Sequence, residues 1–264
     1  MTADPAAPLA PLVSRPDRSA VVVDYDGSLA PIVDDPAHAV PLPAARDALA
    51  SLVPLLGRVA VVSGRPARFL ADVLRIDGLA CVGLYGMERL EDGVVVPDPA
   101  VATYRDAVAE AAADAARRLP GLLIERKGDV AVTVHWRTAP ARQDEAIAAA
   151  EALGERYGLA VIEGRKAREL RPPVPIDKGT AVRALVDGLA AAAFAGDDRA
   201  DIEAFAALDD AVTADRLQAA ARIGVTSPEV PPELLRRADV VVEGPAGLAM
   251  LLDELARRIR GRSS

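Results

Sequence analysis

Two aspartates, Asp24 and Asp26, follow directly after the apolar run of residues 20–23. Such a run is typical of a buried strand, and residues i and i+2 of an extended chain point to the same side. We therefore expect both carboxylates at the carboxyl edge of a parallel sheet, where open α/β folds bind their ligands, with Gly27 allowing a sharp turn. Two like charges this close divide into an ionised group and a proton donor, which suits a nucleophile and a general acid.

An Asp-x-Asp pair alone is equally typical of a turn or a cap, but further segments favour the catalytic interpretation. Ser63 and Gly64 end a second strand-like run and precede Pro66, which is suited to a helix start. There the Ser63 hydroxyl and nearby backbone N–H groups can bind an anion, although a structural N-cap explains Ser63 as well. Lys178 opens a later helical segment, where it can neutralise a phosphate; a solvated surface lysine is the alternative.

A fourth strand-like run ends in Asp197 and Asp198, with Asp201 one helical turn further on. Acidic residues in the first turn of a capped helix would produce the same pattern. Together with Asp24, however, these carboxylates form a hard oxygen site of the kind that Mg²⁺ prefers. The coincidence of all four segments predicts a Mg²⁺-dependent phosphate site.

The elements that must position these residues alternate along the chain, which predicts an α/β fold with a Rossmann-like parallel sheet. Expected strands lie at residues 21–24, 59–63, 80–84, 192–196, 222–226 and 239–242, and expected helices at 43–55, 67–74, 179–190, 198–208, 232–237 and 246–260. The stretch from 85 to 175 is too long for one crossover. It reads as an inserted α+β cap, with a helix at 99–119, strands at 122–126 and 130–137, a helix at 140–157 and strands at 159–163 and 167–171. The predicted domains are therefore a discontinuous core (19–96 and 173–264) and a cap (97–172).

Composition supports a packed protein and limits its partners. The 264 residues are 51% hydrophobic, with a formal net charge of −8, a single cysteine and 3% aromatic residues. The acidic balance disfavours nucleic-acid binding, and no apolar run is long enough to span a membrane. The expected location is cytoplasmic, since residues 1–18 lack a secretory pattern. Those residues are expected to be a disordered start, and residues 258–264 a frayed basic tail.

The four motifs resemble those of the haloacid dehalogenase superfamily of phosphatases, and the position of the insertion resembles a C2-type cap. More narrowly, the chain resembles the trehalose-6-phosphate phosphatase family. This likeness covers residues 24–33, the Ser63-Gly64-Arg65 step, residues 83–88 and three cap segments around residues 125–128, 135–137 and 166–172. Departures from the family pattern fall at Ser28, Tyr85, Trp136, Ala200 and Ile202.

The resemblance implies hydrolysis of trehalose 6-phosphate to trehalose and phosphate, the last step of trehalose biosynthesis. It implies that Asp24 attacks phosphorus to form an aspartyl-phosphate, and that Asp26 protonates the departing sugar oxygen and later deprotonates water. Mg²⁺ would be held by Asp24, the backbone carbonyl of Asp26, and Asp197. Ser63, Gly64 and Lys178 would bind the phosphoryl group, and Asp198 or Asp201 would orient Lys178 or metal-bound water.

Specificity is expected from the cap and one core residue, because the phosphate machinery contacts little of the sugar. The candidate sugar contacts are charged or hydrogen-bonding residues, each with solvation or packing as its alternative: Glu88, Glu125, Lys127, His135, Arg137, Lys166, Glu169 and Arg171. Hinges are expected near Pro97 and at residues 172–175. A related sugar phosphatase acting on sucrose, mannosylglycerate or hexose phosphate is the first alternative, and a non-catalytic sugar-phosphate sensor the second. A functional link to a trehalose-phosphate synthase is a further expectation.

Overall fold

The computed structural model describes residues 4–33, 39–164, 166–228 and 230–262. The chain divides into two compact units. One, called the core unit below, comprises Met1–Val95 and Ile176–Ser264, and the other, the cap unit, comprises Val96–Pro175. Each unit is described by itself.

The large sheet of the core unit places the strand ends that carry the predicted site next to one another. Among the described residues it has eight strands in the order β12-β11-β10-β1-β2-β3-β4-β5. The first six of these are parallel, and β4 runs antiparallel to β3. Their bounds are β1 Ser19–Val23, β2 Arg58–Val62, β3 Ala80–Gly83, β4 Glu88–Glu91, β5 Val94–Pro97, β10 Ala191–Gly196, β11 Ala219–Thr226 and β12 Val240–Glu243. From β1 the chain continues to β2 and β3 on one side of the sheet, and from β10 it continues to β11 and β12 on the other side. The switch point, where such folds bind ligands, therefore lies between β1 and β10.

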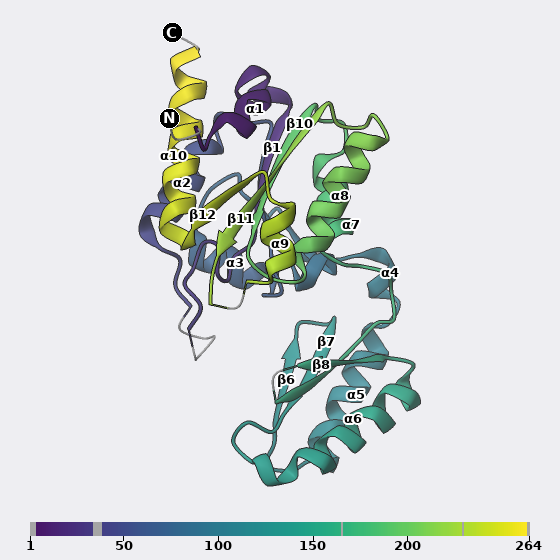
Figure 1. Cartoon of the computed structure of the whole chain (residues 1–264). Helices are drawn as coiled ribbons and strands as arrows, with labels where there is room; N and C mark the ends of the chain where they lie inside the picture. Colours follow the sequence, from purple (N-terminus) through teal and green to yellow (C-terminus); the bar gives the residue numbers. More distant parts are fainter. Residues whose placement is uncertain (1–3, 34–38, 165, 229, 263–264) are drawn as a thin grey trace. The chain divides into compact units, whose positions relative to one another are not determined.

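Both faces of this sheet are buried, which explains why its strands read as continuous apolar runs. Val21 and Val23 of β1 pack in one hydrophobic cluster, and Ala20 and Val22 pack in another. The first cluster includes residues of α1, α2, α3 and α10, and the second includes residues of α7, α8 and α9. The core unit therefore has three layers, with helices on both faces of the sheet (Figure 1).

The helices of the core unit follow the predicted alternation, which confirms the α/β fold class. They are α1 Ala10–Ser14, α2 Pro43–Leu52, α3 Ala67–Leu74, α7 Lys178–Val186, α8 Asp201–Thr213, α9 Pro232–Arg237 and α10 Gly244–Arg262. Strand β10 consists of four alanines, one phenylalanine and one glycine, although alanine has low strand propensity. Its residues are buried on both faces, so tertiary packing outweighs local preference here.

The predicted disorder of the two chain ends is wrong for the residues that the structure describes. Leu9 and Leu12 are fully buried in the first hydrophobic cluster, and α1 contacts α10. Arg258 lies in α10 and forms an ion pair with Asp4, with 2.9 Å between Nη2 and Oδ1. Apolar side chains at helical spacing outweigh the Pro-rich and basic composition of these segments.

The cap unit is a four-stranded antiparallel sheet with helices on one face. The sheet order is β6-β7-β9-β8, formed by β6 Leu123–Lys127, β7 Ala131–His135, β8 Ala160–Gly164 and β9 Ala167–Arg171. Its helices are α4 Pro99–Ala102, α5 Arg105–Arg118 and α6 Gln143–Tyr157. Val132 and Val134 pack with residues of α5 and α6 in a third hydrophobic cluster, which places both helices on that face of the sheet.

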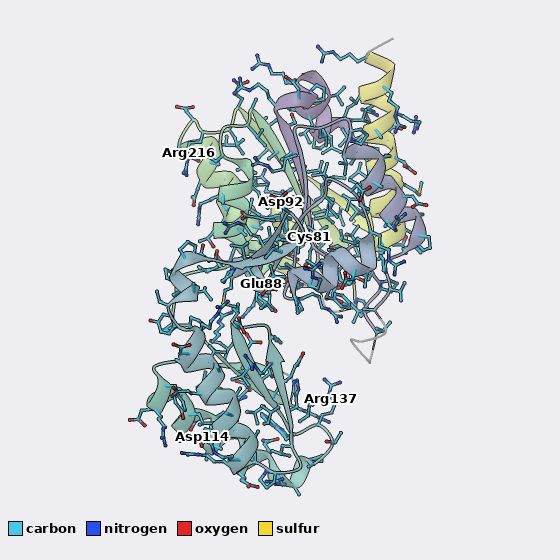
Figure 2. The ribbon with its side chains drawn as sticks, turned by 180° about the vertical axis from the view of Figure 1, so that it is seen from behind. Cys81, Glu88, Asp92, Asp114, Arg137 and Arg216 are labelled. Carbon is cyan, nitrogen blue, oxygen red and sulfur yellow. The ribbon has the colours of Figure 1, made fainter. Side chains whose placement is uncertain are left out.

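One of the predicted cap elements differs from the structure. The expected helix at 99–119 is two helices, because α4 ends at Ala102 and α5 begins at Arg105. Asp114 of α5, labelled in Figure 2, is a buried carboxylate that pairs with arginines 117, 118 and 156 and accepts a hydrogen bond from Tyr157.

Among the described residues of the whole chain, no helix is both long and apolar enough to span a membrane.

Candidate active site

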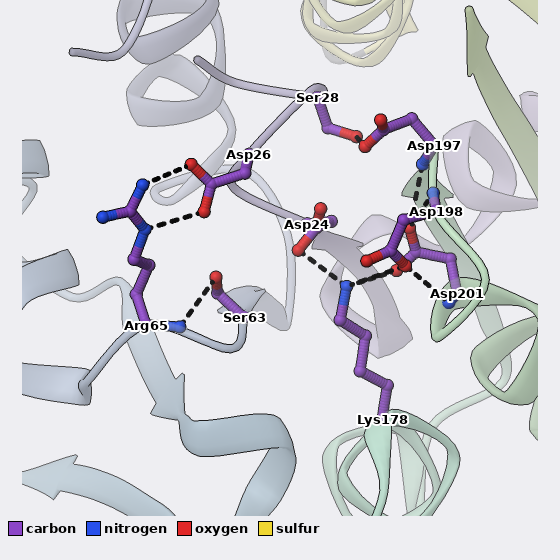
Figure 3. Close-up of polar contacts among 9 residues, drawn as sticks. All are labelled: Asp24, Asp26, Ser28, Ser63, Arg65, Lys178, Asp197, Asp198 and Asp201. Atoms are coloured by element: carbon purple, nitrogen blue, oxygen red, sulfur yellow. Dashed lines mark hydrogen bonds and ion pairs between the residues drawn. The ribbon is translucent and has the colours of Figure 1, made fainter. Parts of the chain in front are cut away.

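Asp24 lies at the carboxyl end of β1 with a buried lysine as its partner. Its backbone N–H donates to the Ala195 carbonyl at 2.8 Å, so the β1–β10 pairing continues to this residue. Lys178 Nζ lies 2.8 Å from Asp24 Oδ1, and the two side chains are 1% and 4% exposed (Figure 3). The first turn of α7 carries Lys178, and a capping box of Asp177 and Thr180 fixes this turn. The Asp24 carboxylate is thus a buried nucleophile candidate with its own cation.

The loop after β10 holds Lys178 from the other side. Asp201 Oδ1 accepts from Lys178 Nζ at 2.6 Å, and Asp198 Oδ1 lies 3.6 Å from the same nitrogen. The second oxygen of Asp201 accepts the backbone N–H groups of Asp197 and Asp198 at 2.8 and 2.9 Å. Asp201 therefore ties the loop to Lys178, and its acceptor sites are largely occupied.

Burial controls the ionisation of this cluster. It raises the pKa of Asp24 to about 7, against the attraction of Lys178 and with the repulsion of Asp198 and Asp197. It also raises the pKa of Asp197 to about 7, against a hydrogen bond from Ser227. For Lys178 burial opposes the charge, yet Asp201, Asp24 and Asp198 raise its pKa well above the ordinary value. The site holds excess negative charge that a further cation would neutralise.

Asp197 lies where the backbone of the β1 loop approaches closely. Gly27 has φ +79°, and a Cβ at this position would overlap the Asp197 carboxylate. The loop is closed by a bond from Gly27 N–H to the Ala30 carbonyl at 2.7 Å. The Ser28 hydroxyl lies 3.5 Å from Asp197 Oδ1. Glycine at 27 is therefore required both for the turn and for the approach to Asp197.

Asp24, Asp197 and Asp201 form a buried acidic group, with one ligand atom from each within 4.8 Å of the others. A divalent cation fits Asp24 and Asp197 better than Asp201, because Asp201 already accepts bonds from Lys178 and two backbone N–H groups. Burial raises the pKa of Asp197, and a cation beside this carboxylate would favour its charged form. Asp26, whose backbone carbonyl is the third predicted ligand, lies two residues after Asp24 in the loop that follows β1.

Ser63 and Gly64 lie at the end of β2, next to β1, as predicted. The backbone N–H of Arg65 donates to Ser63 Oγ at 3.2 Å, and Ser63 is 1% exposed. Gly64 faces the ring of Tyr85, because a Cβ on Gly64 would meet the Tyr85 phenol at 2.6 Å. Leu84 and Tyr85 both have positive φ, 49° and 61°, so the loop after β3 carries backbone strain beside the site.

Asp26 differs from Asp24 in its surroundings. Arg65 Nε donates to Asp26 Oδ2 at 2.8 Å, and Arg65 Nη2 donates to Asp26 Oδ1 at 2.7 Å. The two carboxylates of the first motif thus have separate cations, Lys178 for Asp24 and Arg65 for Asp26 (Figure 3). The sequence predicted neither the Arg65 contact nor the closeness of Gly27 to Asp197. The sequence did offer one signal for the Arg65 contact, because a basic residue directly follows Ser63 and Gly64 at the end of the strand-like run.

Glu88 lies in the core unit, 3% exposed, at the start of β4 (Figure 2). Its Oε1 accepts from the backbone N–H of Ala67 at 2.8 Å. This contact gives Glu88 a role in holding the start of α3, close in sequence to Ser63 and Arg65. Its predicted contact with the sugar stays a prediction.

The two departures in the fourth motif have structural explanations. Ile202 is 9% exposed and packs in the second hydrophobic cluster with residues such as Phe205. Ala200 provides no cap for α8, but Asp198 Oδ1 accepts from the Asp201 N–H at 3.1 Å. Asp198 therefore caps this end of α8 in place of a residue at 200.

Most cap candidates share one face of the cap sheet, the face opposite α5 and α6. The register pairs Glu125 with Thr133 and Thr133 with Glu169, so these three lie in one row across the sheet. By alternation this face, which we call the polar face, includes Leu123, Glu125, Lys127, Thr133, His135, Glu169 and Arg171. Arg137 follows β7, and Lys166 is exposed with φ +56° in the turn before β9.

Contacts between side chains already organise the polar face. Glu125 Oε2 lies 2.8 Å from His135 Nε2. Lys127 Nζ pairs with Glu169 Oε2, and the Thr133 hydroxyl lies 3.4 Å from the same oxygen. Carboxylates held in this way present fixed acceptors, which suits the recognition of hydroxyl groups.

Comparisons with known proteins show which family and which fold this chain resembles. A trehalose-phosphate phosphatase of Mycobacterium marinum is 35% identical over 213 residues, which cover 74% of this chain and 54% of that protein. The C-terminal domain of the C. albicans trehalose-6-phosphate phosphatase has a similar structure, with a TM-score of 0.65, 23% identity, and 93% and 94% of the two chains covered. A haloacid dehalogenase-like hydrolase from Bacteroides thetaiotaomicron gives 0.64 at 16% identity, covering 90% and 98%.

The curated mycobacterial relatives are longer chains, of which this one spans 15 to 63%. The likeness to the two solved structures shows the fold alone. A model of the trehalose-phosphatase family matches residues 22–229, a range that includes Asp24, Lys178 and Asp197. The chain therefore belongs to the trehalose-phosphatase family.

Proposed function

We propose that this chain hydrolyses trehalose 6-phosphate to trehalose and phosphate, the final step in the biosynthesis of trehalose. The observation that carries the proposal is the buried Asp24 at the switch point of the sheet, with Lys178 Nζ 2.8 Å from its carboxylate. Membership of the trehalose-phosphatase family supports the choice of substrate.

Asp24 is the proposed nucleophile. One of its carboxylate oxygens attacks phosphorus, the bond between phosphorus and the sugar oxygen breaks, and an aspartyl-phosphate forms. Asp26 donates a proton to the departing sugar oxygen. In the second step Asp26 accepts a proton from water as that water attacks phosphorus, and the bond to Asp24 breaks to release phosphate.

Lys178, Ser63 and Gly64 bind the phosphoryl group in this proposal. Lys178 is held by three carboxylates, so its charge stays in one place during the reaction. Preorganised donors of this kind stabilise charge that develops in the transition state without reorganising. Asp198 and Asp201 act through Lys178 and the backbone of the loop.

A Mg²⁺ ion fits the carboxylates of Asp24 and Asp197, with the backbone carbonyl of Asp26 as the third proposed ligand from the protein. Bound there, the ion would offset the negative charge of the nucleophile and of the phosphate. Chelation is therefore expected to abolish phosphate release.

The cap unit is proposed to recognise the sugar through its polar face. Glu125 and Glu169 are acceptors for hydroxyl groups, and Lys127, His135 and Arg171 are donors. Arg137 and Lys166 flank this face in sequence. The proposed hinges, near Pro97 and at residues 172–175, would allow entry of a disaccharide.

Initial rates with trehalose 6-phosphate, sucrose 6-phosphate and glucose 6-phosphate test the substrate. Glu125→Ala is expected to lower kcat/KM for trehalose 6-phosphate by about tenfold or more, since unpaired substrate hydroxyls cost 1.4 kcal/mol or more of binding. Glu163→Ala is the matched control. Glu163 is also a strand glutamate of the cap sheet, but its register partner Arg168 pairs with the buried Val134, so it lies on the helix-covered face.

Equal effects of the two cap variants would overturn the assignment of the polar face. Turnover of another sugar phosphate alone would keep the core chemistry and change the substrate. A wild-type protein that binds trehalose 6-phosphate without turnover would be a sensor instead. Affinity capture with a trehalose-phosphate synthase, and fractionation for the cytoplasmic location, test the remaining proposals.

A further inference from the structure

Arg65 binds both oxygens of Asp26 with two parallel hydrogen bonds of 2.8 and 2.7 Å (Figure 3). The rigid fork of a guanidinium matches a carboxylate in this arrangement and fixes its orientation as well as its charge. The Arg65 side chain is 18% exposed and that of Asp26 39%. This pair is therefore better ordered than a solvated surface ion pair, which contributes little.

Aromatic rings hold the guanidinium of Arg65 in turn. Its Cζ lies 5.0 Å from the ring centroid of Phe69 in α3. Phe69 meets Tyr25 edge to face, with centroids 5.8 Å apart and an interplanar angle of 86°. Tyr25 is fully buried, and its hydroxyl donates to the Ala39 carbonyl at 2.7 Å.

These contacts form a closed ring of interactions, which begins at Asp26 and ends at its neighbour Tyr25. Asp26 binds Arg65, Arg65 stacks on Phe69, Phe69 packs on Tyr25, and Tyr25 precedes Asp26 in the chain. A carboxylate on a loop after a strand has several rotamers available. The ring of interactions favours one rotamer of Asp26, and it connects the loop after β1 to the start of α3.

We propose that Arg65 is a positioning residue, which orients the Asp26 carboxylate for proton exchange with the sugar oxygen and with water. The inference rests on the proposed function, because it assigns that exchange to Asp26. Catalytic groups need a position within about 0.5 Å of the productive geometry, which a single contact on a loop does not provide.

Leaving-group dependence tests this role in the Mg²⁺-loaded enzyme. Arg65→Ala is expected to lower kcat for the sugar phosphate by about tenfold or more, with KM changed by less than about threefold, since general acid catalysis supplies 10²–10⁴-fold. The first-turnover release of p-nitrophenol from p-nitrophenyl phosphate is expected to change far less, because this leaving group departs without a proton. Arg65→Lys is not expected to rescue, since an ammonium cannot form the fork.

Arg68→Ala is the matched control, because Arg68 is an arginine three residues further on, in α3, and bonds the Gly93 carbonyl rather than Asp26. The double variant with Asp26→Asn is expected to be no slower than Asp26→Asn alone. Equal losses on both esters, additive effects in the double variant, or full rescue by lysine would overturn the proposal.

A crystal structure of Arg65→Ala supplies a readout that needs no turnover. The proposal expects the Asp26 side chain to leave its rotamer while Asp24 and Lys178 keep theirs. An unchanged Asp26 would refute the positioning role even if the protein had no phosphatase activity. Inactivity of the wild type, in contrast, would count against the proposed function alone.

Discussion

Gly27→Ala is expected to weaken Mg²⁺ binding, whereas the matched variant Gly188→Ala is expected to leave it unchanged. The two glycines have similar positive φ, +79° and +73°. A Cβ on Gly27 would overlap the Asp197 carboxylate, and a Cβ on Gly188 meets nothing within 4 Å. The pair therefore separates backbone strain from intrusion into the site.

The strain component is similar in both variants. Alanine in the left-handed region costs about 1–2 kcal/mol. For a chain of this size that corresponds to a fall in Tm of about 2–8 °C. In Gly27→Ala the clash adds to this strain, because real Cβ atoms essentially never approach another atom within 3.0 Å. The Asp197 carboxylate has to retreat by roughly 1 Å, beyond the tolerance of about 0.5 Å for a functional site.

We expect Gly27→Ala to lose Mg²⁺ affinity by about tenfold or more, the scale found for disturbed metal sites. The assay is the Mg²⁺-dependent rise in Tm, with isothermal titration calorimetry as a second measurement and phosphate release as a third. Wild-type Mg²⁺ affinity in Gly27→Ala would refute the reasoning that Asp197 holds the metal beside Gly27. A comparable loss in Gly188→Ala would attribute the effect to strain.

Three further outcomes follow from the buried groups. Lys178→Met is expected to lower phosphate release by about 10²-fold or more and stability by about 3–5 kcal/mol, because Asp24 and Asp201 lose their buried cation; near-wild-type values in both assays would contradict this. The stability of the metal-free protein is expected to fall as the pH rises between 3.8 and about 7, because the raised pKa values of Asp24 and Asp197 make the folded state bind more protons than the unfolded state. Urea unfolding in a chelator checks this, Asp197→Asn is expected to flatten the slope, and a rising stability would contradict it. Leu12→Ala is expected to cost about 2–5 kcal/mol, against under about 0.5 kcal/mol for the 75% exposed Met250→Ala, and equal Tm values would place residues 4–14 outside the core.

The fold class was predictable because the apolar runs and helical segments alternate along the chain. Runs such as residues 20–23 are apolar throughout because both faces of the sheet are covered. The placement of Asp24 and Asp197 followed from the same pattern, since the carboxyl ends of neighbouring parallel strands meet at one edge. The alternation of apolar runs and helical segments did not predict the hairpin of β4 and β5 at the sheet edge, because these strands are short and only partly buried.

The partners within the site needed three-dimensional information. Arg65 lies 39 residues from Asp26, and no periodic pattern pairs residues at that separation. The overlap that excludes a side chain at Gly27 depends on Asp197, 170 positions further along the chain. The terminal segments were mispredicted for another reason: composition indicated disorder, whereas a few apolar side chains such as Leu9 and Leu12 decided the packing.

The most direct test of the account is phosphate release from trehalose 6-phosphate by the wild type and by Asp24→Asn, each with Mg²⁺ and with a chelator. The account predicts release by the wild type in Mg²⁺ and loss of release in the other three conditions, with Asp24→Asn still folded. Substantial Mg²⁺-dependent release by Asp24→Asn would contradict the central claim that Asp24 is the nucleophile.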